Sequence, residues 1–331
     1  MDPRARTLMV EATRAQESLK PMRALALLLR ALEISPECCH LWMHRGFILK
    51  GLGKLAAAGV SFGNAMALDA RNPLPRECLA SVLYHLGRYQ EAAKLAKSSL
   101  RLKQDAHIYS LLGCILSASH RPRAARTAWV KAIRLDPVCD EAIYNLASYY
   151  SLSRRPKTTM LLLRRAIRID SGCAHYHREL GFVLMQLHRY EDSVRATQES
   201  LRLNPRLANA HTNLGVALEF LGRADEAEAE YALACKVDSD CVLPYLFRAK
   251  NLAARDRIPA ADRCFRRALR AEPTNDRVLR AYGEFLIANG RPERGRVFLE
   301  LHKRQSRPSR QGRPVFGRLH AAGNPSIHAA N

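Results

Sequence analysis

Residues 132–137 read Ala-Ile-Arg-Leu-Asp-Pro, and this tract returns along the chain at a nearly constant spacing. The other copies end at Pro36, Ala70, Gln104, Ser171, Pro205, Ser239 and Pro273. Successive tracts lie 34 residues apart, with a single interval of 33 between Gln104 and Pro137. A fixed period of this length indicates a repeat array, in which each repeat packs only on its neighbours.

The period predicts nine repeats over residues 5–305. They start at residues 5, 39, 73, 106, 140, 174, 208, 242 and 276. Residues 1–4 precede the array. From residue 306 to 331 the period is lost, and four Arg occur with no Asp or Glu, so we expect a basic, disordered tail.

Three positions of the repeat carry small residues throughout the array. The eighth residue is Ala12, Gly46, Ala80, Gly113, Ala147, Gly181, Gly215, Ala249 or Gly283. The twentieth and twenty-seventh positions are also small, apart from His302. Small residues in register predict places where two helices approach closely, because a larger side chain there would overpack at about 1–3 kcal/mol.

Each repeat is predicted to contain two helices with a break between them. The break contains Gly87-Arg88 in the third repeat and Gly222-Arg223 in the seventh, while Pro122 and Pro156 stand where a second helix would begin. Proline is favoured in the first turn of a helix, and short connections make the helices antiparallel neighbours. The fold class is therefore all-α, an α-solenoid of antiparallel helix pairs.

The spacing and the small columns resemble the tetratricopeptide repeat family over residues 5–305. The best single copy is His211-Thr-Asn-Leu-Gly215, followed by Leu218, Gly222, Ala227, Tyr231 and Ala234. The resemblance implies a right-handed superhelix whose first helices line a concave groove. In the family that groove binds peptides or helices of partner proteins.

The resemblance places the second, fifth, ninth and twelfth residues of each repeat in the groove. The residues that we expect there are His40, Met43, Phe47, Tyr84, His107, Tyr144, His175, Arg178, Phe182 and Leu246. Asn145 and Asn213 match the asparagine ladder of the glycosyltransferase members, two repeats apart. The alternative for any of these residues is packing on the neighbouring repeat, because helix faces are broad.

The chain is strongly basic, with 53 Lys and Arg against 31 Asp and Glu and a formal charge of +22. Two columns of the repeat carry much of this charge. The first contains Lys54, Arg88, Arg121, Arg155, Arg189, Arg223 and Arg257, and the second contains Arg134, Arg168, Arg202, Lys236 and Arg270. We expect two basic edges that could attract an acidic protein or nucleic acid. Alternatively, cations at helix ends complement the helix dipole, which would account for the second column better than for the first.

Motifs for chemistry are weak in this sequence. Gly59-Val-Ser-Phe-Gly63 fits the nucleophile-elbow pattern but falls inside a predicted helix, where that chemistry has no strand–turn–helix context. Cys38, Cys39, His40 and His44 are a metal-like cluster without a second cysteine pair or an acidic third ligand nearby in sequence. We therefore predict no catalytic residues, no metal site and no cofactor.

These observations predict a protein-interaction scaffold or adaptor that binds partner peptides or helices, as a subunit of a multiprotein complex. Two alternatives stay open: a basic-edged adaptor for nucleic acid or acidic partners, and a glycosyltransferase-like regulatory region that lacks its catalytic domain. The absence of an apolar run of membrane-span length and the nine cysteines without a C-x-x-C pair predict an intracellular, cytoplasmic protein, with the nucleus left open.

Overall fold

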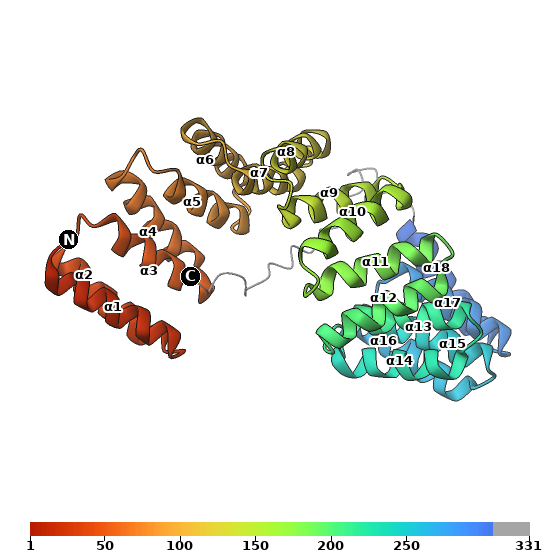
Figure 1. Ribbon diagram of the computed structural model, residues 1–331. Coiled ribbons are helices and arrows are strands. Elements are labelled where there is room, and N and C mark those ends of the chain that lie inside the picture. Colours follow the sequence, from red (N-terminus) through yellow and green to blue (C-terminus); the bar gives the residue numbers. More distant parts are fainter. Residues whose placement is uncertain (307–331) are drawn as a thin grey trace. The chain divides into compact units, whose positions relative to one another are not determined.

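The computed structural model describes residues 1–306, which form eighteen α-helices with no strand among them (Figure 1). The helices are α1 (Pro3–Glu17), α2 (Pro21–Ile34), α3 (Cys39–Gly51), α4 (Leu55–Leu68), α5 (Pro73–His85), α6 (Tyr89–Leu102), α7 (Ala106–Ala118), α8 (Pro122–Leu135), α9 (Asp140–Leu152), α10 (Pro156–Ile169), α11 (Ala174–Gln186), α12 (Tyr190–Leu203), α13 (Ala208–Phe220), α14 (Ala224–Val237), α15 (Val242–Ala254), α16 (Ile258–Ala271), α17 (Asp276–Ala288) and α18 (Pro292–Ser306). The predicted all-α fold of helix pairs is confirmed. Apart from Ser306, the predicted basic tail lies outside the described residues.

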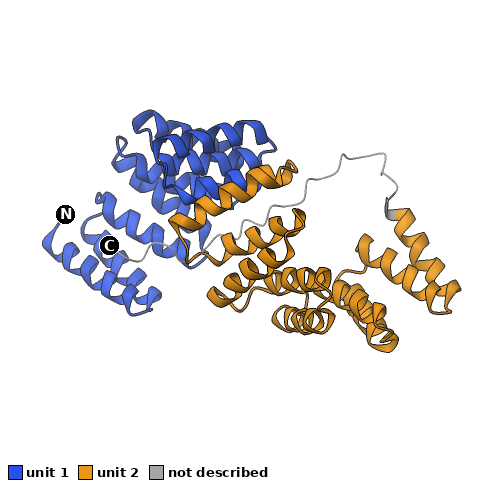
Figure 2. Cartoon of the chain, turned by 45° about the vertical axis from the view of Figure 1, so that its right-hand side comes forward, with its two compact units in different colours: residues 1–149, 318–331 blue, residues 150–317 orange. Residues whose placement is uncertain are grey.

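The chain divides into two compact parts, which we call the N-terminal half (residues 1–149) and the C-terminal half (residues 150–306 of those described) (Figure 2). In the N-terminal half, α1 packs on α2, α3 on α4, α5 on α6 and α7 on α8, and the pairs meet through α2–α3, α4–α5 and α6–α7. In the C-terminal half the same alternation continues from α10 to α18. Each half is therefore a stack of helix pairs.

The turn inside each repeat has the same backbone conformation throughout the described array. Three residues separate the two helices, and the middle one has a positive φ of 53° to 77°. The next residue returns its N–H to the first helix, as Arg88 does to the Leu83 carbonyl at 2.9 Å. This hydrogen bond satisfies a carbonyl that the helix end would leave unpaired.

Glycine occupies the positive-φ position in four of the nine repeats, including Gly87 and Gly222. Leu19, His120, Arg154, His188 and Asp256 take it in the other five. A left-handed conformation costs a residue with a Cβ about 1–2 kcal/mol. The repeated hydrogen-bonded turn imposes this conformation even where the sequence lacks glycine.

In the five repeats with glycine at the eighth position, this glycine lies against the twenty-fourth residue of the same repeat, which is Thr197 in the sixth repeat and a large residue in the other four. A Cβ added at Gly113 would lie 2.3 Å from Nε1 of Trp129, and one at Gly215 would lie 2.5 Å from Cε1 of Tyr231. Trp129 is buried and donates to the Ser110 carbonyl at 3.2 Å, while Tyr231 has no exposed surface. The close helix approach that the small column predicts is confirmed at these positions.

We predict that Gly113→Ala lowers the free energy of unfolding by about 1–3 kcal/mol, because the added methyl group overlaps the Trp129 ring, which has nowhere to move. Gly63→Ala is the matched control: Gly63 also lies within a helix, but a Cβ there meets nothing within 4 Å. The control should leave stability unchanged or raise it by up to about 1 kcal/mol. Urea unfolding followed by circular dichroism measures both, and equal behaviour of the two variants would contradict the packing argument.

Candidate partner-binding surface

The first helix of each pair presents a repeated set of side chains, which we call the first-helix face: the second, fifth, sixth, ninth and twelfth residues of each repeat. Of the twelve residues predicted to line a groove, four are exposed: His40, Phe47, His107 and Phe182. Six are half-buried: Tyr84, Tyr144, Asn145, His175, Arg178 and Asn213. Ten of the twelve therefore keep accessible surface on a first helix.

Met43 and Leu246 are the two exceptions. Met43 is 7% exposed within the core around α3 and α4, and Leu246 is 2% exposed within the core around α15 and α16. The fifth position lies at the border between the exposed side and the core side of the first helix, so its role varies between repeats. We correct their assignment: both are core residues, and a partner would contact little of either side chain.

In the N-terminal half, polar contacts join successive first helices across this face. Lys50 of α3 donates from Nζ to the Ser81 hydroxyl of α5 at 2.9 Å. Burial raises the pKa of Glu77, one turn before Ser81 on the same helix, and the Lys50 charge opposes that rise. Asn145 of α9 donates to the Cys114 sulfur of α7 at 3.3 Å. These contacts fix the orientation of groups that could otherwise turn freely toward solvent.

Two phenylalanines at the ninth position of their repeats remain on the surface, one in each half. Phe47 is 45% exposed and meets the buried Phe62 edge to face, with ring centroids 5.4 Å apart. Phe182 is 38% exposed. Both rings keep more than a third of their surface exposed, so they are available as apolar anchors.

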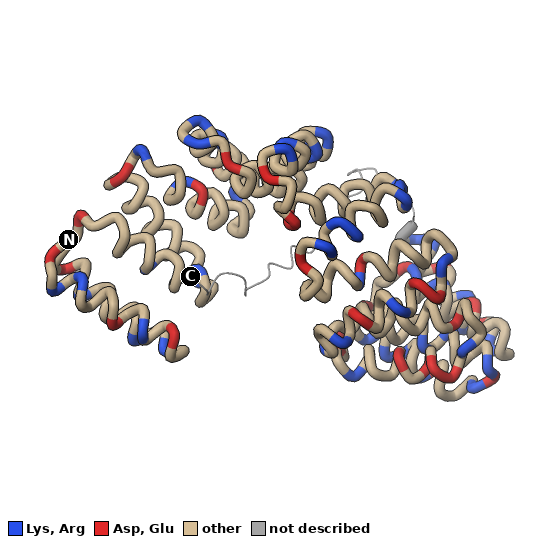
Figure 3. Tube along the Cα trace, in the orientation of Figure 1, with Lys and Arg blue, Asp and Glu red and all other residues tan. Residues whose placement is uncertain are grey.

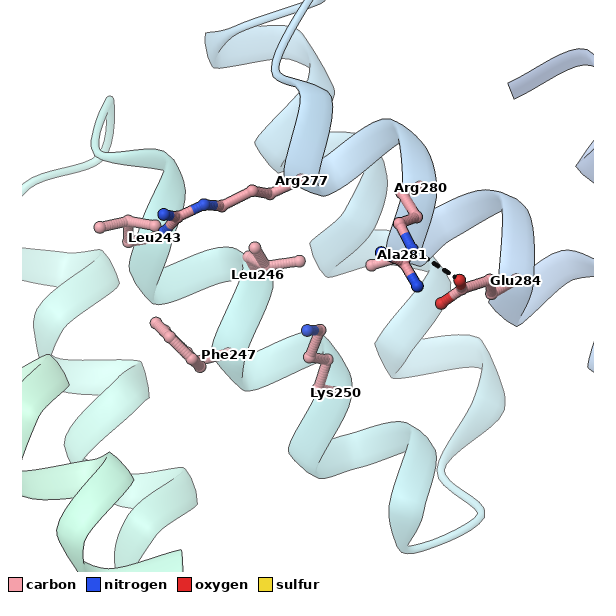
Figure 4. A pocket seen from close by; sticks show the side chains of 8 residues that line it. All are labelled: Leu243, Leu246, Phe247, Lys250, Arg277, Arg280, Ala281 and Glu284. Atoms are coloured by element: carbon pink, nitrogen blue, oxygen red, sulfur yellow. Dashed lines mark hydrogen bonds and ion pairs between the residues drawn. The ribbon is translucent and has the colours of Figure 1, made fainter. Parts of the chain in front are cut away.

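The first-helix face of the C-terminal half is hollowed between α15 and α17, where a pocket of about 330 Å³ lies (Figure 4). Its walls are Leu243, Leu246, Phe247, Lys250, Arg277, Arg280, Ala281 and Glu284. Figure 4 shows Arg277 extending from α17 toward Leu243 on α15. The pocket therefore combines an apolar floor with a charged rim.

Phe247 and Ala281 are pocket residues at the sixth position of their repeats, which the sequence interpretation did not include throughout the array. Phe247 stacks on Tyr231 of the preceding repeat, with ring centroids 6.1 Å apart. Asn145 and Asn213 occupy the same position in their repeats, so extending the groove positions to the sixth residue throughout the array would have included both pocket residues.

The first basic column lies at the junction of the two helices in each repeat. Its members, among them Lys54, Arg121 and Arg155, are the residues that precede the second helix. Each also follows the positive-φ residue and closes the first helix, as Arg121 does by its N–H bond to the Leu116 carbonyl at 2.9 Å. A cation there is favourable for the carboxyl end of the first helix but unfavourable for the amino end of the second, so the helix dipole does not by itself account for this column.

All twelve residues of the predicted basic edges are exposed, and Figure 3 shows Lys and Arg spread among acidic residues in both halves. In the first column, Arg88 pairs with Glu91, Arg189 with Asp192 and Arg223 with Glu226. In the second column, Arg202 pairs with Glu199. Among residues 1–306 the remaining eight have no ion pair: Lys54, Arg121, Arg134, Arg155, Arg168, Lys236, Arg257 and Arg270.

The candidate nucleophile is held inside a helix. Ser61 of the Gly59–Gly63 string lies in α4 with no exposed surface. Its hydroxyl donates to the Ala57 carbonyl at 3.0 Å and accepts from Arg45 at 2.8 Å. Both hydrogen bonds are structural, and the strand–turn–helix context of a nucleophile elbow is missing around this residue.

The cysteine and histidine cluster near residue 40 makes separate contacts. Cys39 donates to the Ala65 carbonyl at 3.5 Å, and His44 contacts Oε1 of Gln16 at 3.0 Å. Within the described part of the chain, no three His, Cys, Asp or Glu side chains converge to hold a metal ion. The nine cysteines all lie in this part, and each is a thiol there.

A family model described as tetratricopeptide repeat matches residues 178–240 and 248–308. Over these residues the chain is similar to the tetratricopeptide repeat family. The matched segments coincide with the repeats that contain α11 to α18. The recognition made from Leu214, Gly215 and Tyr231 is therefore confirmed.

A relative in Homo sapiens, tetratricopeptide repeat protein 7B, is 27% identical over 118 residues. That match covers 35% of this chain and 14% of the relative, so the chain matches a small part of the relative's length. No helix among residues 1–306 has the length and apolar content of a membrane span.

Three solved structures share the fold. A chain in the APC/C hetero-tetramer Cut9–Hcn1 superposes with a TM-score of 0.64 at 14% identity, covering 80% of this chain and 52% of its own. Pseudomonas aeruginosa pilF gives 0.54 at 19% identity, covering 62% and 93%. The C-terminal part of a repeat-containing protein from Cytophaga hutchinsonii gives 0.52 at 16% identity, covering 72% and 98%. At these identities the similarity establishes the helical-repeat fold alone.

One titratable pair is built into the seventh repeat. Nδ1 of His211 lies 2.7 Å from Oε2 of Glu230, and Nε2 lies 3.1 Å from the Pro205 carbonyl. Both partners accept hydrogen bonds, so the geometry suits an imidazolium that donates from both nitrogens. The Glu230 hydrogen bond raises the pKa of His211 above its ordinary value of 6.5, against the opposing effect of burial.

We predict that His211 stabilises the array most at low pH. A base whose pKa is raised on folding contributes fully below its unfolded pKa, and the contribution is lost as the pH rises through the higher folded value. The thermal midpoint of the natural protein should therefore exceed that of His211→Gln by more at pH 6 than at pH 8.5. His44→Gln is the control with the opposite sign, because burial lowers the pKa of His44. A pH-independent difference for His211→Gln would refute the imidazolium.

Proposed function

We propose that this protein is an interaction scaffold that binds an extended or helical segment of a partner protein on its first-helix face, as a subunit of a multiprotein complex. The observation that carries the proposal is the exposure of Phe47 and Phe182 at the ninth position in both halves. The core beneath Phe47 is already closed by Phe62, which has no exposed surface. A partly exposed aromatic ring is the kind of anchor that dominates protein interfaces.

The surroundings of the two rings favour a polypeptide as the partner. The polar groups on the same face, such as Lys50, Ser81 and Asn145, are half-buried and already oriented by hydrogen bonds. Preorganised groups cost less side-chain entropy on binding. An amphipathic helix or an extended segment could combine apolar anchors with these polar contacts. The structure from Cut9–Hcn1 places this fold within a hetero-tetramer, which illustrates such use in another protein.

Site-specific cross-linking in the native cell tests this proposal. With p-benzoylphenylalanine at Phe47 or at Phe182, irradiation should yield discrete cross-linked proteins whose attached peptides can be identified by mass spectrometry. The matched controls are the same substitution at Val60 of α4 and at Leu161 of α10, which are more exposed, at 61% and 63%, and lie on second helices. Adducts formed equally from all four positions, or from Val60 and Leu161 alone, would reject the first-helix face as the binding surface.

Two further inferences from the sequence remain predictions. The first is that the chain is not an enzyme, and the second is the alternative of a glycosyltransferase-like regulatory region. In the described part of the chain, Asn145 and Asn213 are the only asparagines at the sixth position of a repeat, and both are half-buried. Two asparagines that lie two repeats apart make no continuous ladder, so we favour the scaffold. The intracellular, cytoplasmic location likewise remains a prediction.

A basic-edged adaptor for nucleic acid is the second candidate function. The observation that favours it is the set of exposed cations at the helix junctions without an ion pair among the described residues, including Arg121, Arg155 and Arg257. The paired members Arg88, Arg189 and Arg223 provide an internal comparison, because their charge is already partly neutralised by a neighbouring carboxylate.

If the edges bind nucleic acid, affinity for a 30-nucleotide single strand should fall steeply with salt. Neutralising Arg121, Arg155 and Arg257 to Gln should reduce the slope of log K against log salt by about 2, at roughly 0.7 for each phosphate that the variant no longer neutralises. The same change at Arg88, Arg189 and Arg223 should reduce it less. Fluorescence anisotropy between 50 and 200 mM salt measures the slopes. Binding that is undetectable at 50 mM salt, or insensitive to salt, would remove this candidate.

A further inference from the structure

The pocket between α15 and α17 carries positive charge that the fold does not use. Arg280 is the neutralised member of its rim, because its Nε donates to Oε1 of Glu284 at 2.9 Å and Asp276 acts on it as well. Lys250 and Arg277 are exposed and have no ion pair among residues 1–306. Counting Glu284 against the three cations leaves the rim with a net charge of +2.

Helix-end electrostatics do not explain these two cations. Arg277 is the second residue of α17, at the amino end, where the helix dipole disfavours a positive charge. Lys250 lies within α15, away from either end. This separates them from the two basic columns, whose members close or terminate helices. A cation that stability does not require, beside an apolar hollow, points to a ligand.

The floor of the pocket determines which chemical group a ligand could place beside its negatively charged group. Leu246 is buried, Leu243 and Phe247 are half-buried, and Phe247 is held by its stack on Tyr231. A hollow of about 330 Å³ has room for one or two side chains. Covering these carbon atoms removes apolar surface from water, which favours an apolar group. A phosphodiester backbone would leave that floor uncovered.

We propose that this pocket binds an acidic segment of a partner protein, with a carboxylate between Lys250 and Arg277 and an adjacent apolar side chain on Phe247 and Leu243. The inference rests on the proposed function, because the pocket is part of the first-helix face. It adds the chemistry of the partner: Asp or Glu next to a leucine-like or aromatic residue. On α13, the second, fifth and ninth residues of the repeat are Asn209, Thr212 and Val216, which carry no charge.

The probes for this proposal are three pools of fluorescein-labelled 12-residue peptides, which combine Leu, Phe and Ala with Asp and Glu, with Asn and Gln, or with Lys and Arg. Full-length protein should bind the acidic pool about tenfold more tightly than the neutral pool, and the basic pool least, by fluorescence anisotropy at 150 mM salt. Lys250→Glu/Arg277→Glu should weaken the acidic pool by about tenfold, the expected order for reversing two partly exposed charges.

Arg206→Glu/Arg263→Glu is the matched control. It makes the same change in net charge in the same half of the protein, at two exposed cations outside the pocket. It should keep the affinity for the acidic pool within about twofold, since attraction by the overall charge of +22 is largely screened beyond about 8 Å at this salt. Unfolding curves of both variants establish that they are folded. If the charge reversal unfolds the protein, Lys250→Met/Arg277→Met replaces it, with an expected loss of about threefold.

The outcomes separate the pocket from the proposed function. Equal binding of the acidic and neutral pools would overturn the acidic partner and leave the scaffold standing. An equal loss in both double variants would also overturn it, because attraction would then come from overall charge. Binding of a 12-nucleotide single strand more tightly than the acidic pool, with the same sensitivity to Lys250 and Arg277, would replace it by nucleic acid. No binding by any pool would reject peptide recognition on this face altogether.

Discussion

In the five repeats with glycine at the eighth position, the buried contact between that glycine and the twenty-fourth residue holds the helix pair together. Where glycine stands at the eighth position, as at Gly113, the ring of Trp129 occupies the space that a Cβ would fill. This contact sets the distance between the two helices and the rotation of the first helix about its axis. The same rotation turns the ninth residue outward, which is why Phe47 and Phe182 are exposed. The binding surface is therefore a geometric consequence of the core.

The period and the small columns were sufficient to predict the helix pairs, because both reflect backbone proximity that every repeat must satisfy. The first helices begin at Cys39, Pro73 and Ala106, the first residues of the second, third and fourth predicted repeats. The outward positions were harder to assign. Met43 and Leu246 occupy the fifth position, which can face either the solvent or the core. Packing of the neighbouring repeats determines which side it faces. Phe247, which stacks on Tyr231 of the preceding repeat, was missed because the sixth position was not applied to every repeat.

Two kinds of positive charge coexist on this protein, and their local surroundings distinguish them. The residues of the two columns lie at helix ends, and Arg88, Arg189 and Arg223 have a carboxylate three residues later. The cations of the second column favour the carboxyl end of their helix whether or not a partner is present. Lys250 and Arg277 neither lie at the carboxyl end of a helix nor form an ion pair among residues 1–306. They border the apolar carbon atoms of the pocket. A high net charge therefore says little about binding until each cation is placed within its helix.

The hydrogen-bonded turn inside each repeat fixes the position of the second helix relative to the first. All nine such turns contain three residues, whereas the connections between consecutive repeats contain four, except for residues 103–105. An insertion inside a repeat would rotate the second helix by about 100° and withdraw its large side chain from the first. A deletion between repeats spares that contact, and the single 33-residue interval arises there. Over evolutionary time the array can thus change length in the connections between repeats, while the packing of the two helices inside each repeat is kept.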